Sequence, residues 1–265
     1  MSADQVSADP ARTALVLGGS GDIGAAVAAR LATDGYDILL AGRSTERLDG
    51  VARRITQATG RRVWPLACDL RVRGGGRSLV EGAVEKAGRI DVLACCAGEF
   101  RRGDLLALEE EDWEAGFGAM FFGAVKAVRA AWPHLRESQG SVVMIAGVFA
   151  YKPPAHGALP GALAAAVLNF TKSAAELGLR DGVRVNCVLP GPIAGRRLDE
   201  NLTRLMAERG LSHADALAAY AKQLGIARVG TPEDVASAIA FLVSPSATFI
   251  RGASLVLDGG GLRML

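Results

Sequence analysis

The sequence predicts an α/β protein with one doubly wound parallel sheet of seven strands and helices on both faces of that sheet. Seven short β-type runs alternate with stretches that carry Leu, Val and Ala at helical spacing. The runs are apolar throughout, which is typical of strands covered by helices on both sides. A glycine-rich segment, residues 18–24, follows the first run and opens a helix. The chain has 265 residues, half of them hydrophobic, so a single domain is expected.

The elements follow in order from local patterns. The predicted strands are residues 13–18, 36–41, 62–69, 90–97, 141–146, 183–189 and 254–258. A long helix is predicted over residues 160–177, with a proline at its first position, where a missing N–H costs nothing. Its predicted apolar stripe consists of Leu163, Val167, Phe170, Ala174 and Leu177.

The domain is predicted to span residues 13–265, after a disordered N-terminus of residues 1–12. Two irregular tracts, residues 148–159 and 190–197, follow predicted strands. Open α/β sheets bind ligands at the carboxyl ends of their strands, so a small-molecule ligand is expected there.

Composition disfavours several classes of partner. Lys and Arg number 30 against 28 Asp and Glu, and no basic run is long enough to follow a phosphate backbone, so nucleic acid is not expected. No apolar stretch reaches the ~20 residues of a membrane span, and the N-terminus lacks the basic-then-apolar order of a secretory signal. A cytoplasmic protein is therefore expected.

The four cysteines lie in apolar, strand-like settings without the paired spacing of a zinc site. They are Cys68, Cys95, Cys96 and Cys187. Buried, reduced thiols and no metal are predicted.

The segment "GGSGDIG", residues 18–24, is typical of a turn that holds a dinucleotide. Its glycines permit a tight turn close to a pyrophosphate, and the N–H groups at the helix start favour the anion. The alternative is that a tight strand-to-helix turn needs glycine regardless of any ligand.

Arg43 follows the second predicted strand, where no acidic residue is present to accept a ribose 2′-hydroxyl. A cation there suits a 2′-phosphate and favours NADP(H) over NAD(H), the alternative being a solvated arginine. Asp69, after the third strand, is a candidate acceptor for the adenine amino group.

From Thr13 onward the chain resembles the short-chain dehydrogenase/reductase family, most closely its 3-ketoacyl carrier protein reductase-like members. The matching stretches are "GGSGDIG", "GRIDVLACCAG", "GSVVMIAG", "LNFTKSAAELGLRDGVRVNCVLPGPI", "ARVGTPEDVASAIAFLVS" and "GASLVLDGG". The resemblance implies a Rossmann-type fold. It also implies cofactor contacts from Gly18, Ser20, Asp22, Ile23, Gly24, Arg43, Asp69, Leu70, Ala97, Gly98, Pro190, Gly191 and Ile193.

The family's activity depends on a tetrad of Asn, Ser, Tyr and Lys, in which the tyrosine exchanges a proton with the substrate oxygen. Alignment from two separate motifs places the tyrosine, lysine and serine positions at Pro160, Ala164 and Gly147. The asparagine position falls at Met120. All four are residues without a side-chain proton to give, so no catalytic residue is predicted.

The loop before the long predicted helix offers two candidate substitutes for the tyrosine. Tyr151 and Lys152 are adjacent rather than four residues apart, and the prolines that follow them indicate a loop. His156 lies in the same loop and can titrate near neutral pH, although a lone loop histidine is more often incidental.

Three departures bear on the cofactor. Asp22 occupies the second glycine position of the turn, and it either caps its own helix or repels the pyrophosphate. Cys95 and Cys96 replace paired asparagines, and Gly195 replaces a threonine that would contact the nicotinamide amide. NADP(H) binding is therefore predicted, but weakened.

Three functions fit this pattern. The first is a non-catalytic subunit (a pseudoenzyme) that partners an active family member as a homo- or hetero-oligomer, dimer or tetramer, through residues 109–136 and 160–179. The second is an isomerase, cyclase or dehydratase that uses the old cleft. The third is an NADPH-dependent ketone or 3-ketoacyl reductase with an atypical site.

Polar side chains for the second function would come from His156, Tyr151, Glu99, Arg101 or Arg196. Residues 192–225 resemble the family's helical lid over the substrate. Arg196 and Arg197 in that lid would meet a phosphate or carboxylate, or else are simply solvated.

Overall fold

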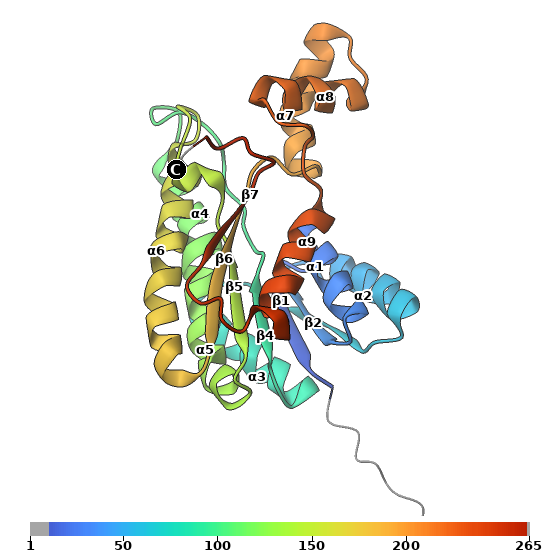
Figure 1. The fold of residues 1–265 in the computed structure, drawn as a ribbon, viewed down its shortest axis with the longest axis vertical. Coiled ribbons are helices and arrows are strands. Elements are labelled where there is room, and N and C mark those ends of the chain that lie inside the picture. Colours follow the sequence, from blue (N-terminus) through green and yellow to red (C-terminus); the bar gives the residue numbers. More distant parts are fainter. Residues whose placement is uncertain (1–10, 264–265) are drawn as a thin grey trace, which may run out of the picture.

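The computed structural model describes residues 11–263, with the side chains at 200, 201, 204 and 205 excluded. Its sheet has seven parallel strands in the order β3-β2-β1-β4-β5-β6-β7 (Figure 1). The strands are β1 (Thr13–Leu17), β2 (Asp37–Gly42), β3 (Val63–Ala67), β4 (Val92–Cys95), β5 (Ser141–Ile145), β6 (Arg184–Pro190) and β7 (Ser254–Leu257). All seven predicted strands are confirmed, each within two residues of its expected bounds.

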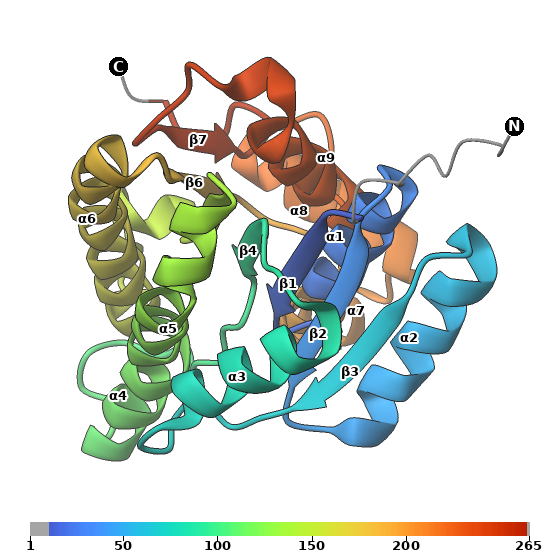
Figure 2. The ribbon, with the colours of Figure 1, turned by 90° about the horizontal axis from the view of Figure 1, so that it is seen from below.

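Helices cover both faces of the sheet (Figure 2). One face carries α1 (Asp22–Thr33), α2 (Thr45–Thr59) and α9 (Pro232–Val243), and the other carries α3 (Gly75–Ala87), α5 (Gly123–Glu137) and α6 (Ala158–Asp181). Along β1, Leu15 packs into one of the two resulting cores and Val16 into the other, both with no exposed surface. The uninterrupted apolar character of the strands thus has the predicted cause.

A π-helical segment interrupts the long helix beside α6. The helix α4 (Glu110–Gly116) continues through the π-helical η1 (Phe117–Phe122) into α5. Met120, on η1, is 7% exposed and belongs to the core. Short π-helical segments are frequent at functional sites, and this one lies at the family's asparagine position.

The helix α6 begins at Ala158, two residues earlier than predicted. Pro160 is therefore its third residue, still within the first turn, where an N–H has no acceptor inside the helix. Of the predicted apolar stripe, Leu163 and Val167 are buried, whereas Leu177 is 40% exposed, so the stripe is wrong at that end. The helix ends where Gly182 adopts a left-handed conformation at φ 77°.

Two helices, α7 (Arg196–Arg209) and α8 (His213–Leu224), stand above the carboxyl edge of the sheet as the predicted lid (Figure 1). The lid has a small core of its own, formed by Leu198, Leu202, Ala216, Ala221, Ile226 and Val229. The short 3-10 helices η2 (Val148–Ala150) and η3 (Pro245–Ala247) complete the described elements.

The predicted disordered N-terminus lies mostly outside the described residues. At its end, the Arg12 carbonyl accepts a hydrogen bond from the Asp37 N–H at 2.9 Å. The Arg12 guanidinium carbon lies 4.4 Å from the centroid of the Tyr36 ring. Arg12 thus contacts the start of β2, one residue before the predicted start of the domain.

Within the described residues, no helix combines the length and the apolar character that a membrane span needs.

Candidate functional site

The turn between β1 and α1 has the shape that the glycine pattern predicts. Gly18 has φ +71°, and a Cβ there would lie 2.8 Å from the backbone of Ala97. A Cβ on Gly24 would lie 2.2 Å from the Gly18 carbonyl oxygen. Gly21 is the N-cap of α1, and no side chain caps the first turn. The N–H groups of Asp22, Ile23 and Gly24 therefore face an anion site, and the turn fits a pyrophosphate.

Asp22 was predicted either to cap its own helix or to repel the pyrophosphate. In the structure it does not cap its own helix, so the first alternative is wrong. Its Oδ2 accepts a hydrogen bond from the Arg196 N–H at 3.0 Å, at the start of α7. A Cβ on Gly195 would lie 2.5 Å from the same oxygen. The Asp22 carboxylate thus joins the first turn to the lid and occupies the space beside Gly195.

A second contact ties the lid to the opposite wall of the cleft. Arg197 Nη2 donates to the Gly98 carbonyl oxygen at 2.5 Å. Its guanidinium carbon lies 4.4 Å from the centroid of the Phe100 ring. Both Arg197 contacts are therefore made within the protein. In this conformation they do not support the alternative that Arg197 meets a phosphate or carboxylate.

Arg43 and Asp69 both have protein partners. Arg43 forms an ion pair with Glu99, and the two side chains are 55% and 65% exposed. A 2′-phosphate would replace an exposed carboxylate at Arg43, which costs little. Asp69 accepts hydrogen bonds from the Arg71 N–H at 2.9 Å and from the Arg71 guanidinium at 2.6 to 3.1 Å, and this pairing lowers the Asp69 pKa to about 2.

The Arg43–Glu99 pair lines a hollow of about 310 Å³ at the carboxyl ends of β2, β3 and β4. Its lining residues are Arg43, Arg71, Glu99, Phe100, Arg101, Asp112, Ala115, Gly116 and Ala119. This hollow adjoins the predicted adenosine end of the cofactor.

The remaining predicted cofactor residues lie at the same edge of the sheet. The Ser20 carbonyl accepts from Arg47 Nη2 at 3.0 Å, and Leu70 is buried. Gly191, which follows Pro190 at the end of β6, donates its N–H to the Leu257 carbonyl at 2.9 Å. Ile193 forms an isolated parallel bridge with Gly230. The structure therefore brings together residues from β1, β2, β3, β4 and β6, as the motif order predicts.

The tetrad positions also lie at this edge, and none of them carries a proton donor. A Cβ on Gly98 would lie 3.5 Å from the Met120 sulfur. A Cβ on Gly147 would lie 3.9 Å from the Pro190 carbonyl oxygen, which leaves room for a larger side chain. Pro160 is buried, and Ala164 is 2% exposed.

The polar residues named for an altered chemistry do not converge. Glu99 pairs with Arg43, and Arg101 Nη1 pairs with Asp112 Oδ2 at 2.9 Å. Tyr151 is 40% exposed at the end of η2. His156 is exposed and makes an edge contact with the Phe149 ring, with the ring centroids 6.5 Å apart.

Sequence reasoning missed Arg102. Its guanidinium carbon lies 5.5 Å from the centroid of the Phe149 ring, so Arg102 and His156 contact the same side chain. The only signal in the sequence was the pair of arginines in "EFRRGD", of which Arg101 alone was considered.

The four cysteines form no disulfide in the structure. Cys95 and Cys187 are buried as predicted, whereas Cys68 and Cys96 are only half-buried. Burial raises the pKa of the Cys187 thiol to about 12 and raises that of Cys95 further. In the described part of the chain, no group of three or more His, Cys, Asp or Glu side chains is arranged to hold a metal ion.

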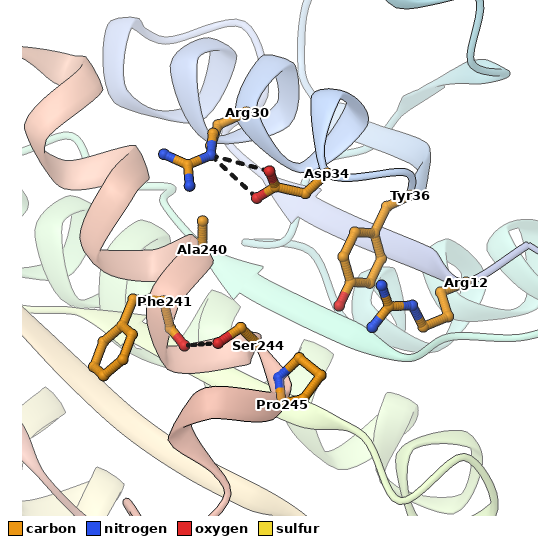
Figure 3. Close-up of a pocket in the computed structure, with 8 residues that line it drawn as sticks. All are labelled: Arg12, Arg30, Asp34, Tyr36, Ala240, Phe241, Ser244 and Pro245. Atoms are coloured by element: carbon orange, nitrogen blue, oxygen red, sulfur yellow. Dashed lines mark hydrogen bonds and ion pairs between the residues drawn. The ribbon is translucent and has the colours of Figure 1, made fainter.

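A larger hollow, of about 420 Å³, lies at the opposite edge of the sheet, between α1 and α9 (Figure 3). Arg30 and Asp34 point toward each other there and form an ion pair at 3.1 Å. This hollow contains none of the predicted site residues, and its arginines are engaged with Asp34 and Tyr36.

Known proteins resemble this chain over nearly its whole length. The family model described as "Enoyl-(Acyl carrier protein) reductase" matches residues 19–261. The short-chain reductase protein NovJ of Streptomyces niveus is 31% identical, over 97% of this chain and 96% of the relative. The tropinone reductase-like 3 protein of Erythroxylum coca is also 31% identical, over 94% of this chain and 92% of the relative.

Solved structures also resemble this chain over nearly its whole length. L-sorbose reductase from Gluconobacter frateurii, complexed with NADPH and L-sorbose, has a TM-score of 0.91 at 28% identity, over 96% of this chain and 97% of that one. A short chain oxidoreductase from Pseudomonas aeruginosa PAO1, bound to NADPH and containing an atypical catalytic center, has a TM-score of 0.89 at 28% identity, over 96% and 98%. With this sheet order, first turn and lid, the chain belongs to the short-chain dehydrogenase/reductase family.

Proposed function

We propose that this protein is an NADPH-dependent reductase of carbonyl compounds with an atypical catalytic centre. The observation that carries the proposal is the first turn of α1, whose N–H groups have no side-chain cap, together with Arg43 at the end of β2. Structural neighbours that are NADPH complexes support it, and one of them is described as having an atypical catalytic center. Among the three functions that the sequence allows, this one has the most support.

NADPH, when bound, supplies a hydride for the substrate carbonyl carbon. The residues of this chain position the cofactor and enclose the substrate. The first turn of α1 binds the pyrophosphate, Arg43 binds the 2′-phosphate, and α7 covers the cleft. Since no tetrad position offers a proton, the substrate oxygen takes its proton from water or from His156. A positioned general acid contributes ~10²–10⁴-fold, so slow turnover is expected.

The second candidate is a non-catalytic subunit of an active relative. The four replaced tetrad positions favour it, because an interface needs the fold but no proton donor. The isomerase, cyclase or dehydratase function lacks such support, since Glu99 and Arg101 are engaged in separate ion pairs.

A calorimetric titration of the purified protein with NADPH and NADH tests the proposal. NADPH is expected to bind in the micromolar range, at least tenfold more tightly than NADH, because only NADPH offers a phosphate to Arg43. The variant Arg43→Ala should remove that preference. Arg54→Ala, on the exposed side of α2, is the matched control and should leave it intact. No heat with either nucleotide would contradict the proposal.

Turnover is tested by NADPH oxidation with simple ketones and diketones, and His156→Ala reports whether that side chain gives the proton. The combined variant Pro160→Tyr, Ala164→Lys, Gly147→Ser and Met120→Asn restores the tetrad and should raise a slow rate by ~10²-fold or more. NADPH binding without any oxidation, in both proteins, would favour the non-catalytic subunit instead.

A further inference from the structure

Arg102 lies in the tract between β4 and α4. Its neighbour Gly103 forms a parallel bridge with Gly157, immediately before α6. This bridge holds the arginine beside the segment that leads to Pro160, the family's tyrosine position. Arg102 therefore lies on the substrate side, away from the Arg43–Glu99 pair at the predicted adenosine end.

The guanidinium of Arg102 is unusual among the arginines around the cleft. Arg43, Arg71 and Arg101 each have a carboxylate partner within the protein. Arg102 has no hydrogen bond or ion pair with any described residue, and its Nε is buried. A buried donor without an acceptor costs free energy, so the native state gains from a ligand that supplies one.

An aromatic side chain lies beside this donor. The Arg102 guanidinium carbon lies 5.5 Å from the centroid of the Phe149 ring, and the His156 ring meets the edge of Phe149. Burial lowers the pKa of the Arg102 guanidinium. An aromatic face from η2 thus lies beside a partly desolvated cation, a setting in which charge-assisted hydrogen bonds are strong.

We propose that Arg102 binds an anionic group of the carbonyl substrate, a carboxylate or a phosphate, with Phe149 as one wall of that subsite. The planar guanidinium suits either group, because both offer two oxygens to its fork of N–H donors. This inference rests on the proposed function, since it names the substrate class of the same cleft. Keto acids or keto phosphates are then the preferred substrates, ahead of neutral ketones.

The test compares three small probes that differ in charge: acetoacetate, dihydroxyacetone phosphate and the neutral methyl acetoacetate. Each is titrated by calorimetry into the full-length protein, with and without saturating NADPH. At least one anionic probe should bind tenfold or more tightly than the neutral ester. Comparing acetoacetate with dihydroxyacetone phosphate shows which of the two anions the subsite takes.

Three variants attribute the effect to this side chain. Arg102→Gln should remove the preference for the anionic probe and leave the affinity for methyl acetoacetate within twofold. Arg102→Lys keeps the charge without the fork and should retain part of the preference. Arg54→Gln, on the exposed side of α2 and outside the lining of the described hollow, removes an arginine elsewhere and should behave as the unmodified protein.

Equal affinity of all three probes, or an anion preference that survives Arg102→Gln, would overturn the inference. Failure to bind either anionic probe would also overturn it, provided that circular dichroism shows the native fold. The proposed function fails separately, through the absence of NADPH binding. The titrations without cofactor still test the Arg102 subsite in that case.

Discussion

Asp22 and Gly195 are two departures from the family pattern that the structure explains together. The Asp22 carboxylate fits beside residue 195 because that residue has no side chain, since a Cβ there would lie 2.5 Å from Oδ2. A threonine at 195 would displace this carboxylate, and it would also be strained by the backbone, which has φ +135° at that position, so the aspartate and the glycine fit together. The lid gains a cap at Arg196, and a negative charge lies next to the anion site of α1.

Asp22→Gly should therefore strengthen NADPH binding by about tenfold, because it removes a carboxylate that repels the pyrophosphate. Asp22→Asn should give a similar gain, since it removes the charge but keeps an acceptor for the Arg196 N–H. The affinities are measured by calorimetry. Asp34→Asn, at the other end of α1, is the control with an equal loss of charge. Unchanged or weaker binding in Asp22→Gly would show that the carboxylate does not oppose the cofactor.

At the scale of the element, α9 shows how a local sequence motif fixes a helix that packs against α1. Thr231 is the N-cap, and Asp234 is the third residue of the helix. The Asp234 carboxylate accepts from the Thr231 N–H at 2.7 Å and from Arg228 Nη1 at 2.6 Å. These bonds, led by the one from Arg228, lower the Asp234 pKa to about 2. Proline at the first helical position completes a start signal readable in "ARVGTPEDV".

Asp234→Asn should lower the free energy of unfolding by about 1 kcal/mol at neutral pH, because asparagine keeps an acceptor oxygen but loses the charge that pairs with Arg228. The native pKa lies below the usual value of about 4, so the carboxylate's contribution is complete above pH ~5 and is lost as the pH falls toward 2. The difference between the native protein and the variant should accordingly shrink between pH 5 and pH 2. Urea denaturation at pH 7 and pH 3 measures both differences.

Glu233→Gln, the exposed neighbour on the same turn, is the control for that comparison and should change stability much less. A difference between Asp234→Asn and the native protein that stayed constant down to pH 2 would exclude the carboxylate as its source.

At the level of the whole molecule, exposed apolar side chains on two helical segments support the proposed assembly of this chain into an oligomer. Residues 109–136 and 160–179, proposed above as interface segments, expose apolar side chains, with Phe122 52% exposed and Leu179 59% exposed. The Phe122 ring packs on Phe121, 5.3 Å between centroids, and Phe121 packs on Phe170 of α6. An aromatic cluster thus joins both segments and reaches the surface, which is the composition favoured at interface centres.

Native mass spectrometry should show a dimer or tetramer, and Phe122→Glu should shift it toward the monomer. Leu106→Glu, at a loop residue that is 94% exposed and outside both segments, is the control and should leave the mass unchanged. Expression in the protein's own host separates the two kinds of oligomer, because a hetero-oligomer carries a related subunit with it. A monomer under all conditions would contradict the proposed assembly.

The sheet and the first turn could be predicted from the sequence alone, whereas the replacement of the family's tetrad stays a prediction from the alignment of two motifs. Strands that are buried on both faces are apolar throughout, and the turn at Gly18 is formed by residues that are adjacent in the sequence. Local sequence patterns are therefore enough to predict both the strands and the turn. Features that depend on tertiary packing were predicted less well. The helix α6 begins two residues before Pro160, and Leu177 is exposed rather than buried.

Which side chains contact one another at the carboxyl edge of the sheet depends on the tertiary structure. Asp22 bonds a backbone N–H 174 positions away, and Glu99 pairs with Arg43 across 56. Arg102 stands out because Arg43, Arg71 and Arg101 each pair with an acid and it does not, a contrast that no spacing along the chain records. Periodicity reports how much of a residue is buried, whereas pairing depends on which loops the sheet order brings together, and the chemistry of this cleft is determined by pairing.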